Sequence, residues 1–428
     1  MKAIILAAGI GKRMQPIQKD KCLMKFLGKE LILHQIEKLE RCKIKEFIIV
    51  CNPRCVEKIK ELVGKKAEYV LQSEANGMAD ALLSIQNPPK EALIVGISDL
   101  LEENAYEKVL NKTDGDGIIL GYRVKEYFPG GYLTTDGENV KGIVEKPGAG
   151  KEPSDLVNIV VHLHRKFDKL LEYMKSTKSD KDDVYERAMN KMMEDGNDFR
   201  YVHYDGRWIP IKYPWHILDA MNFFLENVEE KISESAEISS NATISGNVVI
   251  EDGVKIFENA VINGPCYIGK NCIIGTNALI REAIVSEGCV IGFGTELARS
   301  YIGEKTMIHT NYIGDSIIAD NCNFAAGTTV GNWRFDEQPI KVSVGDVKIS
   351  TGKTKFGCIV GENCKTGINV SIMPGIKMGP NSIVGPGVIL SEDLESNKII
   401  FVKQEQNVKE NNYISDKKEG FIKRFLKK

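Results

Sequence analysis

The stretch that decides the fold of the second half is ISESAEISSNATISGNVVI, residues 232–250. An isoleucine stands at every sixth position, and this series runs unbroken from Ile232 to Ile280. A triangular coil with three short faces of six residues explains the period. One side chain per face points inward, and equivalent side chains of successive coils stack on one another. Gly, Asn, Asp and Ser between the isoleucines suit tight corners. The sequence therefore predicts a parallel β-helix.

The repeat becomes less regular after this series. Its phase slips near Arg281, continues through Val285, Ile291 and Leu297, and is then looser as far as Phe324. Residues 332–356 depart from the period, which predicts a loop extruded from the coil. The period returns afterwards, at Val360, Ile372, Met378, Val384 and Leu390.

The first half alternates apolar strand-like runs with helical periodicity, which is typical of a mainly parallel sheet covered by helices. Strands are expected at 3–7, 46–50, 69–71, 92–96, 117–121 and 157–163, and helices at 31–42, 79–85 and 186–193. The alternation stops near Val228. We therefore expect an α/β domain at residues 1–228, a β-helix at 229–402 and a basic tail at 403–428. The end of that tail, 420–428, reads either as a frayed terminus or as a weak membrane or partner contact.

Composition excludes several classes of protein. The net charge of −2 predicts no general attraction to nucleic acid or to anionic membranes. No stretch approaches the roughly 20 apolar residues of a membrane span, and the apolar run at the N-terminus is too short for a signal peptide. The ten cysteines include no C-x-x-C pair, so neither a zinc knuckle nor a redox motif is indicated. These features predict a cytoplasmic protein with reduced cysteines.

A glycine loop follows the first predicted strand, in the segment LAAGIGKRM at residues 6–14. Such a loop can direct backbone N–H groups toward phosphates, while Arg13 neutralises their charge. The alternative is a tight turn with no role in binding. The longer string, continued by Lys21 before a leucine, resembles the opening of the sugar-1-phosphate nucleotidylyltransferases. This resemblance implies a Rossmann-like domain in which Arg13 and Lys21 are catalytic, and in which three loop residues bind the nucleotide: Ala8, Gly9 and Gly11.

More of that family's pattern follows in order along residues 1–225. Gln72 and Gly77 match the segment that reads the nucleobase, and Asp99 matches a magnesium-binding aspartate, although an aspartate after a strand can also be a helix cap. Sugar and phosphate contacts are implied at Glu145, Lys146 and Asn158. The resemblance thus implies transfer of a nucleotidyl group from a nucleoside triphosphate, expected to be UTP, to a sugar-1-phosphate, with Mg²⁺ as cofactor and release of pyrophosphate.

Three positions depart from this pattern. Asp20 replaces a usual proline, and Met78 replaces a usual threonine next to the base-reading glycine. The closing segment, WIPIKYPW at residues 208–215, has Pro210 where the family has a second metal-binding aspartate. Either Asp205, or water and phosphate oxygens, would then complete the coordination of a magnesium ion.

The β-helix carries a second resemblance, in MIHTNYIGDS at residues 307–316. It is similar to the hexosamine-1-phosphate N-acetyltransferase domain that is fused to the same type of nucleotidylyltransferase. His309 would be the general base that deprotonates the amine attacking acetyl-CoA, a role suited to an imidazole. The resemblance implies sugar-phosphate contacts at Arg281, Tyr312, Asn323 and Asn332, and NWRFDE at residues 332–337 is especially close to archaeal-type, UDP-N-acetylglucosamine pyrophosphorylase-like fused proteins.

Two lysines of that acetyltransferase pattern are altered, to Ala298 and Gln338, with Arg299 and Lys341 close by. Three hypotheses therefore stay open. The first is a bifunctional enzyme with a left-handed β-helix of hexapeptide repeats, assembled as a homotrimer, that acetylates glucosamine-1-phosphate and makes a UDP-N-acetylhexosamine. The second keeps only nucleotidyl transfer and uses the β-helix as a scaffold. The third is a regulatory or binding protein, which Pro210 favours and the retained Gly9, Arg13, Lys21, Asp99 and Lys146 oppose.

Overall fold

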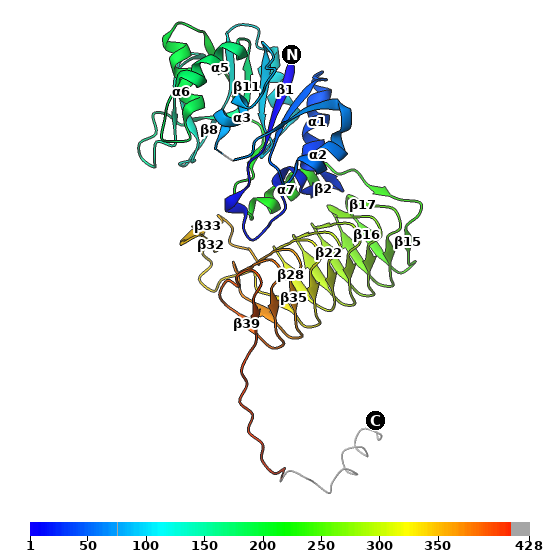
Figure 1. Ribbon diagram of the computed structural model, residues 1–428. Helices are drawn as coiled ribbons and strands as arrows, with labels where there is room; N and C mark the ends of the chain where they lie inside the picture. Colours follow the sequence, from blue (N-terminus) through cyan, green and yellow to red (C-terminus); the bar gives the residue numbers. More distant parts are fainter. Residues whose placement is uncertain (75, 412–428) are drawn as a thin grey trace.

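The computed structural model describes residues 1–74 and 76–411. An α/β domain lies on one side of a long coil of short strands (Figure 1). The α/β domain is built on a nine-stranded sheet. In spatial order its strands are β5 (Ala67–Leu71), β4 (Phe47–Cys51), β1 (Lys2–Ala7), β6 (Ala92–Gly96), β11 (Leu156–His164), β8 (Gly117–Arg123), β12 (Phe199–Tyr204), β10 (Asn139–Glu145) and β9 (Gly131–Asp136).

Helices cover both faces of this sheet, since its central strands are apolar on both sides. Ile5 of β1 contributes to the core shared with α1, α2, α4 and α7, whereas the next residue back, Ile4, faces α3, α5 and α6. The helices are α1 (Leu31–Arg41), α2 (Val56–Val63), α3 (Met78–Leu83), α4 (Glu103–Asn111), α5 (Phe167–Ser176), α6 (Val184–Glu194) and α7 (His216–Leu225). Each predicted strand and helix of this half is present.

The sheet is more mixed than the sequence predicts. Strands β5, β4, β1 and β6 are parallel, but β11 runs antiparallel to both β6 and β8. The hairpin of β9 and β10 adds further antiparallel pairs. Neither strand of that hairpin was predicted, because GYLTTD and NVKGIVE contain too few apolar residues to form a recognisable run.

The second half forms the predicted left-handed parallel β-helix, with three sheets of stacked short strands. Sheet one comprises β14 (Lys231–Ile232), β17 (Val248–Ile250), β20 (Cys266–Ile268), β23 (Ile284–Val285), β26 (Tyr301–Ile302), β29 (Ile317–Ile318), β34 (Ile359–Val360) and β37 (Lys377–Met378). Sheet two comprises β15 (Glu237–Ile238), β18 (Lys255–Ile256), β21 (Ile273–Ile274), β24 (Val290–Ile291), β27 (Met307–Ile308), β30 (Asn323–Phe324), β35 (Lys365–Thr366), β38 (Ile383–Val384) and β40 (Ile399–Ile400). Sheet three comprises β16 (Thr243–Ser245), β19 (Val261–Asn263), β22 (Leu279–Arg281), β25 (Glu296–Ala298), β28 (Tyr312–Gly314), β31 (Thr329–Val330), β36 (Ser371–Ile372) and β39 (Ile389–Leu390).

The isoleucines of the repeat stack on one another along each sheet. Ile232 pairs with Ile250 and Ile250 with Ile268, and the next residue of this column is Val285. The phase slip near Arg281 is therefore a coil shortened by one residue, and it leaves the column of inward side chains intact.

Residues 332–356 leave the coil, as predicted. They contain an antiparallel hairpin of β32 (Lys341–Val344) and β33 (Val347–Ser350). The loop closes where the Phe356 N–H donates to the Asn332 carbonyl oxygen at 3.0 Å. Lys353 from this loop pairs with Asp219 of α7, so the loop reaches back to the α/β domain.

Sheet one of the β-helix faces the α/β domain. Its outward side chains Tyr267, Ile284 and Tyr301 belong to the same buried cluster as Phe26 and the apolar face of α7. No helix among the described residues is long and apolar enough to cross a membrane. Residues 403–411 follow the last coil without regular structure, and the basic segment 420–428 lies outside the described residues.

Candidate functional site

Two adjacent cavities lie at the edge of the α/β sheet where β1 and β6 end. The first, of about 350 Å³, we call the Asp99 cavity, because Asp99 lies in its wall with Glu145, Lys146 and Asn158. The second, of about 310 Å³, we call the Gln72 cavity; it is lined by Ala8, Gly9, Gln72 and Gly77. They share Met78, Ser98, Asp99, Val160 and Asp182, so a ligand can extend from one into the other.

The two residues predicted to be catalytic in this domain, Arg13 and Lys21, line different cavities. Gly11 has φ of 60°, a backbone conformation that favours glycine, and it lies in van der Waals contact range of the Lys21 side chain. Arg13 lines the Asp99 cavity, with its guanidinium 5.5 Å from the ring centroid of Tyr213. Lys21 lines a third space, the Lys21 cavity, of about 490 Å³. Burial, together with nearby Arg13, lowers the pKa of Lys21 to about 8.

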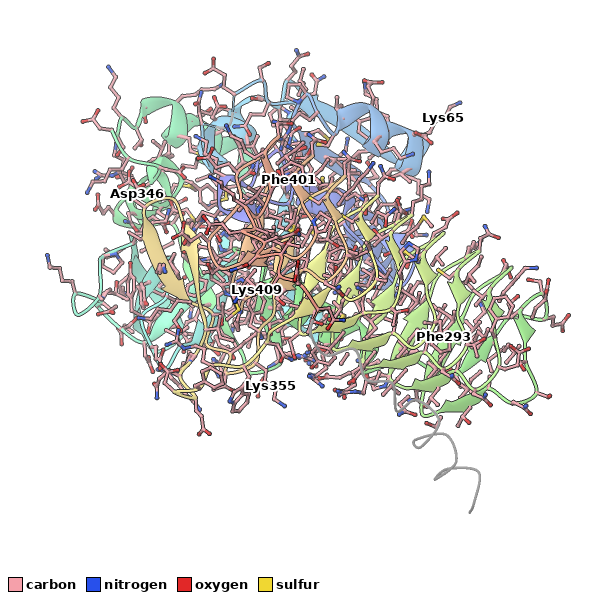
Figure 2. All side chains as sticks on the ribbon, turned by 90° about the horizontal axis from the view of Figure 1, so that it is seen from below. Lys65, Phe293, Asp346, Lys355, Phe401 and Lys409 are labelled. Carbon is pink, nitrogen blue, oxygen red and sulfur yellow. The ribbon has the colours of Figure 1, made fainter. Side chains whose placement is uncertain are left out.

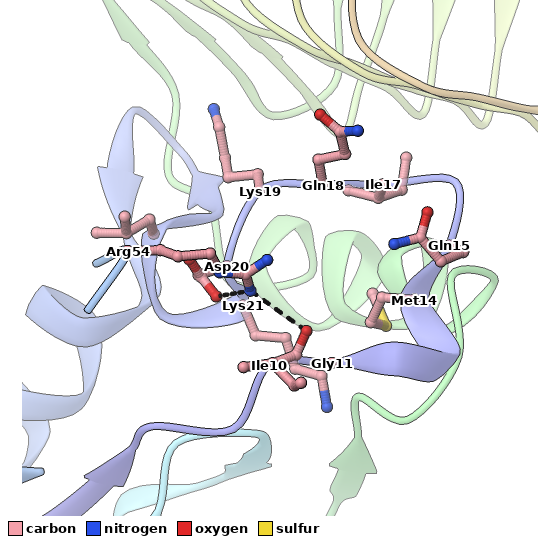
Figure 3. A pocket seen from close by; sticks show the side chains of 11 residues that line it. Ile10, Gly11, Met14, Gln15, Ile17, Gln18, Lys19, Asp20, Lys21 and Arg54 are labelled. Atoms are coloured by element: carbon pink, nitrogen blue, oxygen red, sulfur yellow. Dashed lines mark hydrogen bonds and ion pairs between the residues drawn. The ribbon is translucent and has the colours of Figure 1, made fainter. Parts of the chain in front are cut away.

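Arg54 adds a cation to the Lys21 cavity (Figure 3). Its guanidinium donates to the Asp20 carboxylate at 2.5 Å and to the Ile10 carbonyl oxygen at 3.3 Å. Asn52 also donates to Asp20, at 3.2 Å. The departure from proline at position 20 thus provides a carboxylate that holds Arg54 beside the glycine loop.

The Gln72 cavity is shaped by fixed polar groups. Nε2 of Gln72 donates to the Gly77 carbonyl oxygen at 3.1 Å and to the Asp80 carboxylate at 2.7 Å. Gly77 has φ of 94°, and a Cβ there would lie 1.9 Å from Oδ1 of Asp182. A side chain at this position would strain the backbone and displace the Asp182 carboxylate from the cavity wall.

Acidic and amide groups line the other end, in the Asp99 cavity. Lys146 pairs with Glu145 at 2.7 Å. A Cβ at Gly131 would lie within 3.1 Å of both Asn158 and Glu145, so this glycine keeps the two side chains accessible. Glu186 is buried behind them, and burial followed by the charge of Glu145 raises its pKa to about 8.

The residues around Asp99 do not fit a dedicated magnesium site. Pro210 of β13 (Trp208–Pro210) lies directly opposite Asp99 of β7 (Asp99–Leu101), where the family pattern has its second carboxylate. Asp205 does not substitute for it, because Asp205 is exposed and pairs with Lys108 at 2.9 Å. Among residues 1–74 and 76–411, no three His, Cys, Asp or Glu side chains are grouped to hold a metal ion. Asp99 as a metal ligand remains a prediction without a partner ligand.

In the β-helix, His309 lies at the corner between sheets two and three, directly after β27. Its imidazole is exposed, and no described residue hydrogen-bonds to it. Its backbone is fixed, since its N–H donates to the Phe324 carbonyl oxygen at 3.0 Å and its carbonyl accepts from Thr295. The ring is therefore available to a ligand.

Two of the predicted sugar-phosphate residues of this domain are joined directly. Asn332 donates to the Tyr312 hydroxyl at 3.2 Å and to Asp315 at 2.5 Å. Arg299, next to the altered position Ala298, makes two hydrogen bonds to the same Asp315, at 2.7 and 2.8 Å. Tyr312, Asn332 and an arginine thus form one network.

The other predicted residues lie near this network without joining it. Arg281, two coils away on sheet three, pairs with Glu296 at 2.7 Å. Asn323 begins β30 on sheet two, where it pairs with Met307. Gln338 is exposed in the extruded loop and hydrogen-bonds only to Asp336 among the described residues.

The sequence did not identify Lys212, Glu186 and Arg54 as site residues. Lys212 lies in the closing segment, two residues after the altered Pro210, and this placement was a usable signal. Glu186 lies in a helix of apolar periodicity and gave none. Arg54 became relevant only through its contact with Asp20.

Comparison with known proteins identifies each part of the chain. The family model "Nucleotidyl transferase" matches residues 2–227. "GMPPB C-terminal domain" matches 226–335, and "Bacterial transferase hexapeptide (six repeats)" matches 357–392.

Curated relatives align over nearly the whole chain. A "Bifunctional sugar-1-phosphate nucleotidylyltransferase/acetyltransferase" of Sulfurisphaera tokodaii is 33% identical, over 92% of this chain and 98% of the relative. A "Bifunctional protein GlmU" of Methanococcus vannielii is 33% identical over 96% and 100%, and one of Methanocaldococcus jannaschii is 32% identical over 95% and 98%. The chain therefore belongs to the family of bifunctional sugar-1-phosphate nucleotidylyltransferase/acetyltransferase proteins.

Proposed function

We propose that the α/β domain transfers a nucleotidyl group from a nucleoside triphosphate to a sugar-1-phosphate. The observation that carries this proposal is a continuous pair of cavities that runs from Gln72 and Gly77 to Glu145, Lys146 and Asn158, with Arg13 in its wall. Lys21 lines a separate cavity beside the glycine loop. The phosphate oxygen of the sugar attacks the α-phosphorus, and the bond to pyrophosphate breaks. The attacking oxygen is already charged, so the reaction depends on positioning and charge neutralisation and requires no strong base.

The hydrogen bonds of Gln72 favour particular nucleobases. Both hydrogens of its Nε2 are used, by Gly77 and Asp80, whereas no residue that the structure describes donates to its Oε1. This oxygen accepts from a ring N–H, which uracil, thymine and guanine have and cytosine and adenine lack at that edge. UTP is the donor that we propose, and N-acetylhexosamine-1-phosphate the acceptor.

Magnesium enters this proposal only as the counterion of the triphosphate, because the residues around Asp99 do not form a site of their own. Mg²⁺ is commonly held mainly by substrate phosphates and water in such enzymes. The substrates are metabolites of the cytoplasm, where we place the reaction.

The β-helix is the proposed N-acetyltransferase. His309 would take a proton from the amine of glucosamine-1-phosphate as that amine attacks the thioester carbonyl of acetyl-CoA, and the thiolate of coenzyme A leaves. The hydrogen-bonded network of Tyr312, Asn332 and Arg299 would bind the sugar phosphate, with Arg281 further along sheet three.

A homotrimer is supported by exposed apolar side chains at the corner that carries His309. Phe257, Phe293, Ile368 and Phe401 each follow a strand of sheet two by one or two residues, and they are 42%, 59%, 54% and 69% exposed. Figure 2 shows Phe293 on the outside of the coil. Packing against neighbouring copies would cover these side chains and complete a site around His309.

The test is a pair of assays on one protein sample. Pyrophosphate release is measured with four nucleoside triphosphates and several sugar-1-phosphates, and thiol release with acetyl-CoA and either glucosamine- or galactosamine-1-phosphate. We expect turnover with UTP, acetylation of glucosamine-1-phosphate, and a trimeric mass by light scattering. Pyrophosphate release without thiol release would indicate that the β-helix has only a structural role. If neither pyrophosphate nor free thiol is released, a regulatory protein is favoured, which the proline at position 210 also suggests.

A further inference from the structure

The residue opposite Asp99 cannot provide a second ligand for a metal ion. Pro210 has no side-chain oxygen, and it pairs with Asp99 in the short ladder of β7 and β13. One oxygen of Asp99 accepts from Nε1 of Trp208 at 2.8 Å, and the other lies 2.9 Å from where a Cβ of Gly96 would be. Asp99 is thus held in place with one of its oxygens already bonded.

Lys212 brings a positive charge to the same cavity. Its backbone is fixed two residues after Pro210, because its N–H donates to the Pro210 carbonyl oxygen at 3.0 Å and to Nδ1 of His216 at 3.1 Å. Its ammonium donates to the Pro129 carbonyl oxygen at 2.9 Å and lies 3.4 Å from the ring centroid of Phe128. Each of these contacts is with an uncharged group.

Three of the cations around these cavities make no ion pair with a described residue. In the described part of the chain, Arg13, Lys21 and Lys212 make no ion pair, whereas Lys146 pairs with Glu145. Half-buried ammonium groups without a counterion are costly in a folded protein. Burial lowers the pKa of Lys212 to about 8, which is the expected consequence of that cost. An anionic ligand would supply the missing charge.

We propose that Lys212 is a catalytic residue whose ammonium binds a substrate phosphate beside Asp99. It would supply the positive charge that, in the family pattern, a metal ion held by a second aspartate provides. This inference rests on the proposed nucleotidyl transfer. During that reaction a bond forms between the sugar phosphate oxygen and the α-phosphorus, and pyrophosphate leaves with the electron pair of the broken bond. Lys212 keeps its protons and neutralises charge on the phosphate oxygens.

The kinetic test compares Lys212→Met, Lys212→Arg and a control, Lys125→Met, in an exposed lysine outside the three cavities. We expect Lys212→Met to lower kcat by roughly 100-fold or more, as removal of a charge-stabilising donor does. Arginine should restore most of the rate, and the control should match wild type. Thermal unfolding of Lys212→Met checks that the variant is folded. A folded Lys212→Met with wild-type kcat would overturn the proposal.

A second readout is independent of turnover. Binding of Mn²⁺ to the protein is followed by electron paramagnetic resonance, for wild type and for the double variant Pro210→Asp/Lys212→Gly. We expect the double variant to bind Mn²⁺ at least about 10-fold more tightly than wild type. Tight binding by wild type that Asp99→Asn abolishes would show that a metal ion, and not Lys212, is the cation of this site.

Failure of the proposed function is distinguished by binding of UTP, measured by calorimetry. If wild type turns over no nucleotide, the proposed function fails, yet weaker UTP binding by Lys212→Met would still support the phosphate contact. Unchanged UTP binding in an inactive protein would overturn the role of Lys212 as well.

Discussion

Glu186 is a buried carboxyl group in the wall of the Asp99 cavity, and its protonation links stability to pH. Its folded-state pKa of about 8 lies above the ordinary value of 4.5, because of burial and the charge of Glu145. The stabilisation from its protonated form is therefore complete below about pH 4.5 and is lost as pH rises through about 8. The loss is on the order of a few kcal/mol.

Glu186→Gln should remove this pH dependence, since an amide does not ionise. We expect the variant to be more stable than wild type at pH 9 and similar to it at pH 5, as measured by urea unfolding at both pH values. Glu194→Gln, on an exposed position of the same helix, is the matched control. An equal response to pH in wild type and Glu186→Gln would contradict the assignment.

Lys21 should matter for the chemical step more than for nucleotide binding. Its ammonium lies against the glycine loop, where a developing pyrophosphate charge would be neutralised. Lys21→Met is expected to lower kcat for pyrophosphate release by roughly 100-fold or more, with a much smaller change in the UTP dissociation constant. A variant that retains the wild-type rate would rule out this role.

His309 separates the two proposed activities. An amide at this position cannot accept the proton of the attacking amine, so His309→Asn should reduce thiol release by roughly 100-fold or more. Pyrophosphate release should be unchanged, because His309 lies on the β-helix and outside all three cavities of the α/β domain. Loss of both activities would indicate that the substitution disturbs the fold.

At the residue scale, the sequence indicated the positions that retain a family motif, such as Gln72, Gly77 and Lys146. It could not indicate positions whose role is created by packing. In the sequence, Arg54 cannot be distinguished from other surface arginines, because its contact with Asp20 is formed only by the fold.

At the scale of elements, the β-helix was predictable because its period acts in one dimension: each inward isoleucine contacts the equivalent residue one coil away. The α/β sheet was less predictable, since the antiparallel insertion of β11 between β6 and β8 joins segments far apart in sequence. Hydrophobic runs identify strands, but they carry no information about strand order or direction.

The stack predicts unequal effects for isoleucines in the same phase of the repeat. Ile268 is fully buried, whereas Ile232 in the first coil is 40% exposed. Ile268→Ala should cost about 2–5 kcal/mol of stability because it leaves a cavity in the column. Ile232→Ala should cost about 1 kcal/mol or less, since this site is already open to water. Calorimetric unfolding midpoints test the difference, and equal shifts would contradict the stacked core.

At the scale of the whole molecule, the β-helix supports the segment that carries Lys21. The Glu362 carboxylate accepts from the backbone N–H of Gln18 at 3.0 Å and of Lys19 at 3.1 Å. Lys19 also pairs with Asp320 at 2.5 Å, and Lys25 with Glu304 at 2.6 Å. These contacts join residues that are hundreds of positions apart, and no local sequence pattern indicates them.

Removing the Glu362 contact should therefore affect the α/β domain from a distance. Glu362→Ala leaves the amides of Gln18 and Lys19 without this acceptor and loosens the segment that ends at Lys21. A hydrogen bond to a charged group contributes about 1.5–3 kcal/mol, so we expect faster hydrogen exchange at these two amides and a roughly tenfold lower kcat for nucleotidyl transfer. Thiol release should be unaffected. Glu392→Ala, an exposed glutamate at the far end of the coil, is the matched control. Unchanged exchange at Gln18 and Lys19 would show that the β-helix does not hold this segment, and the two domains would then work independently.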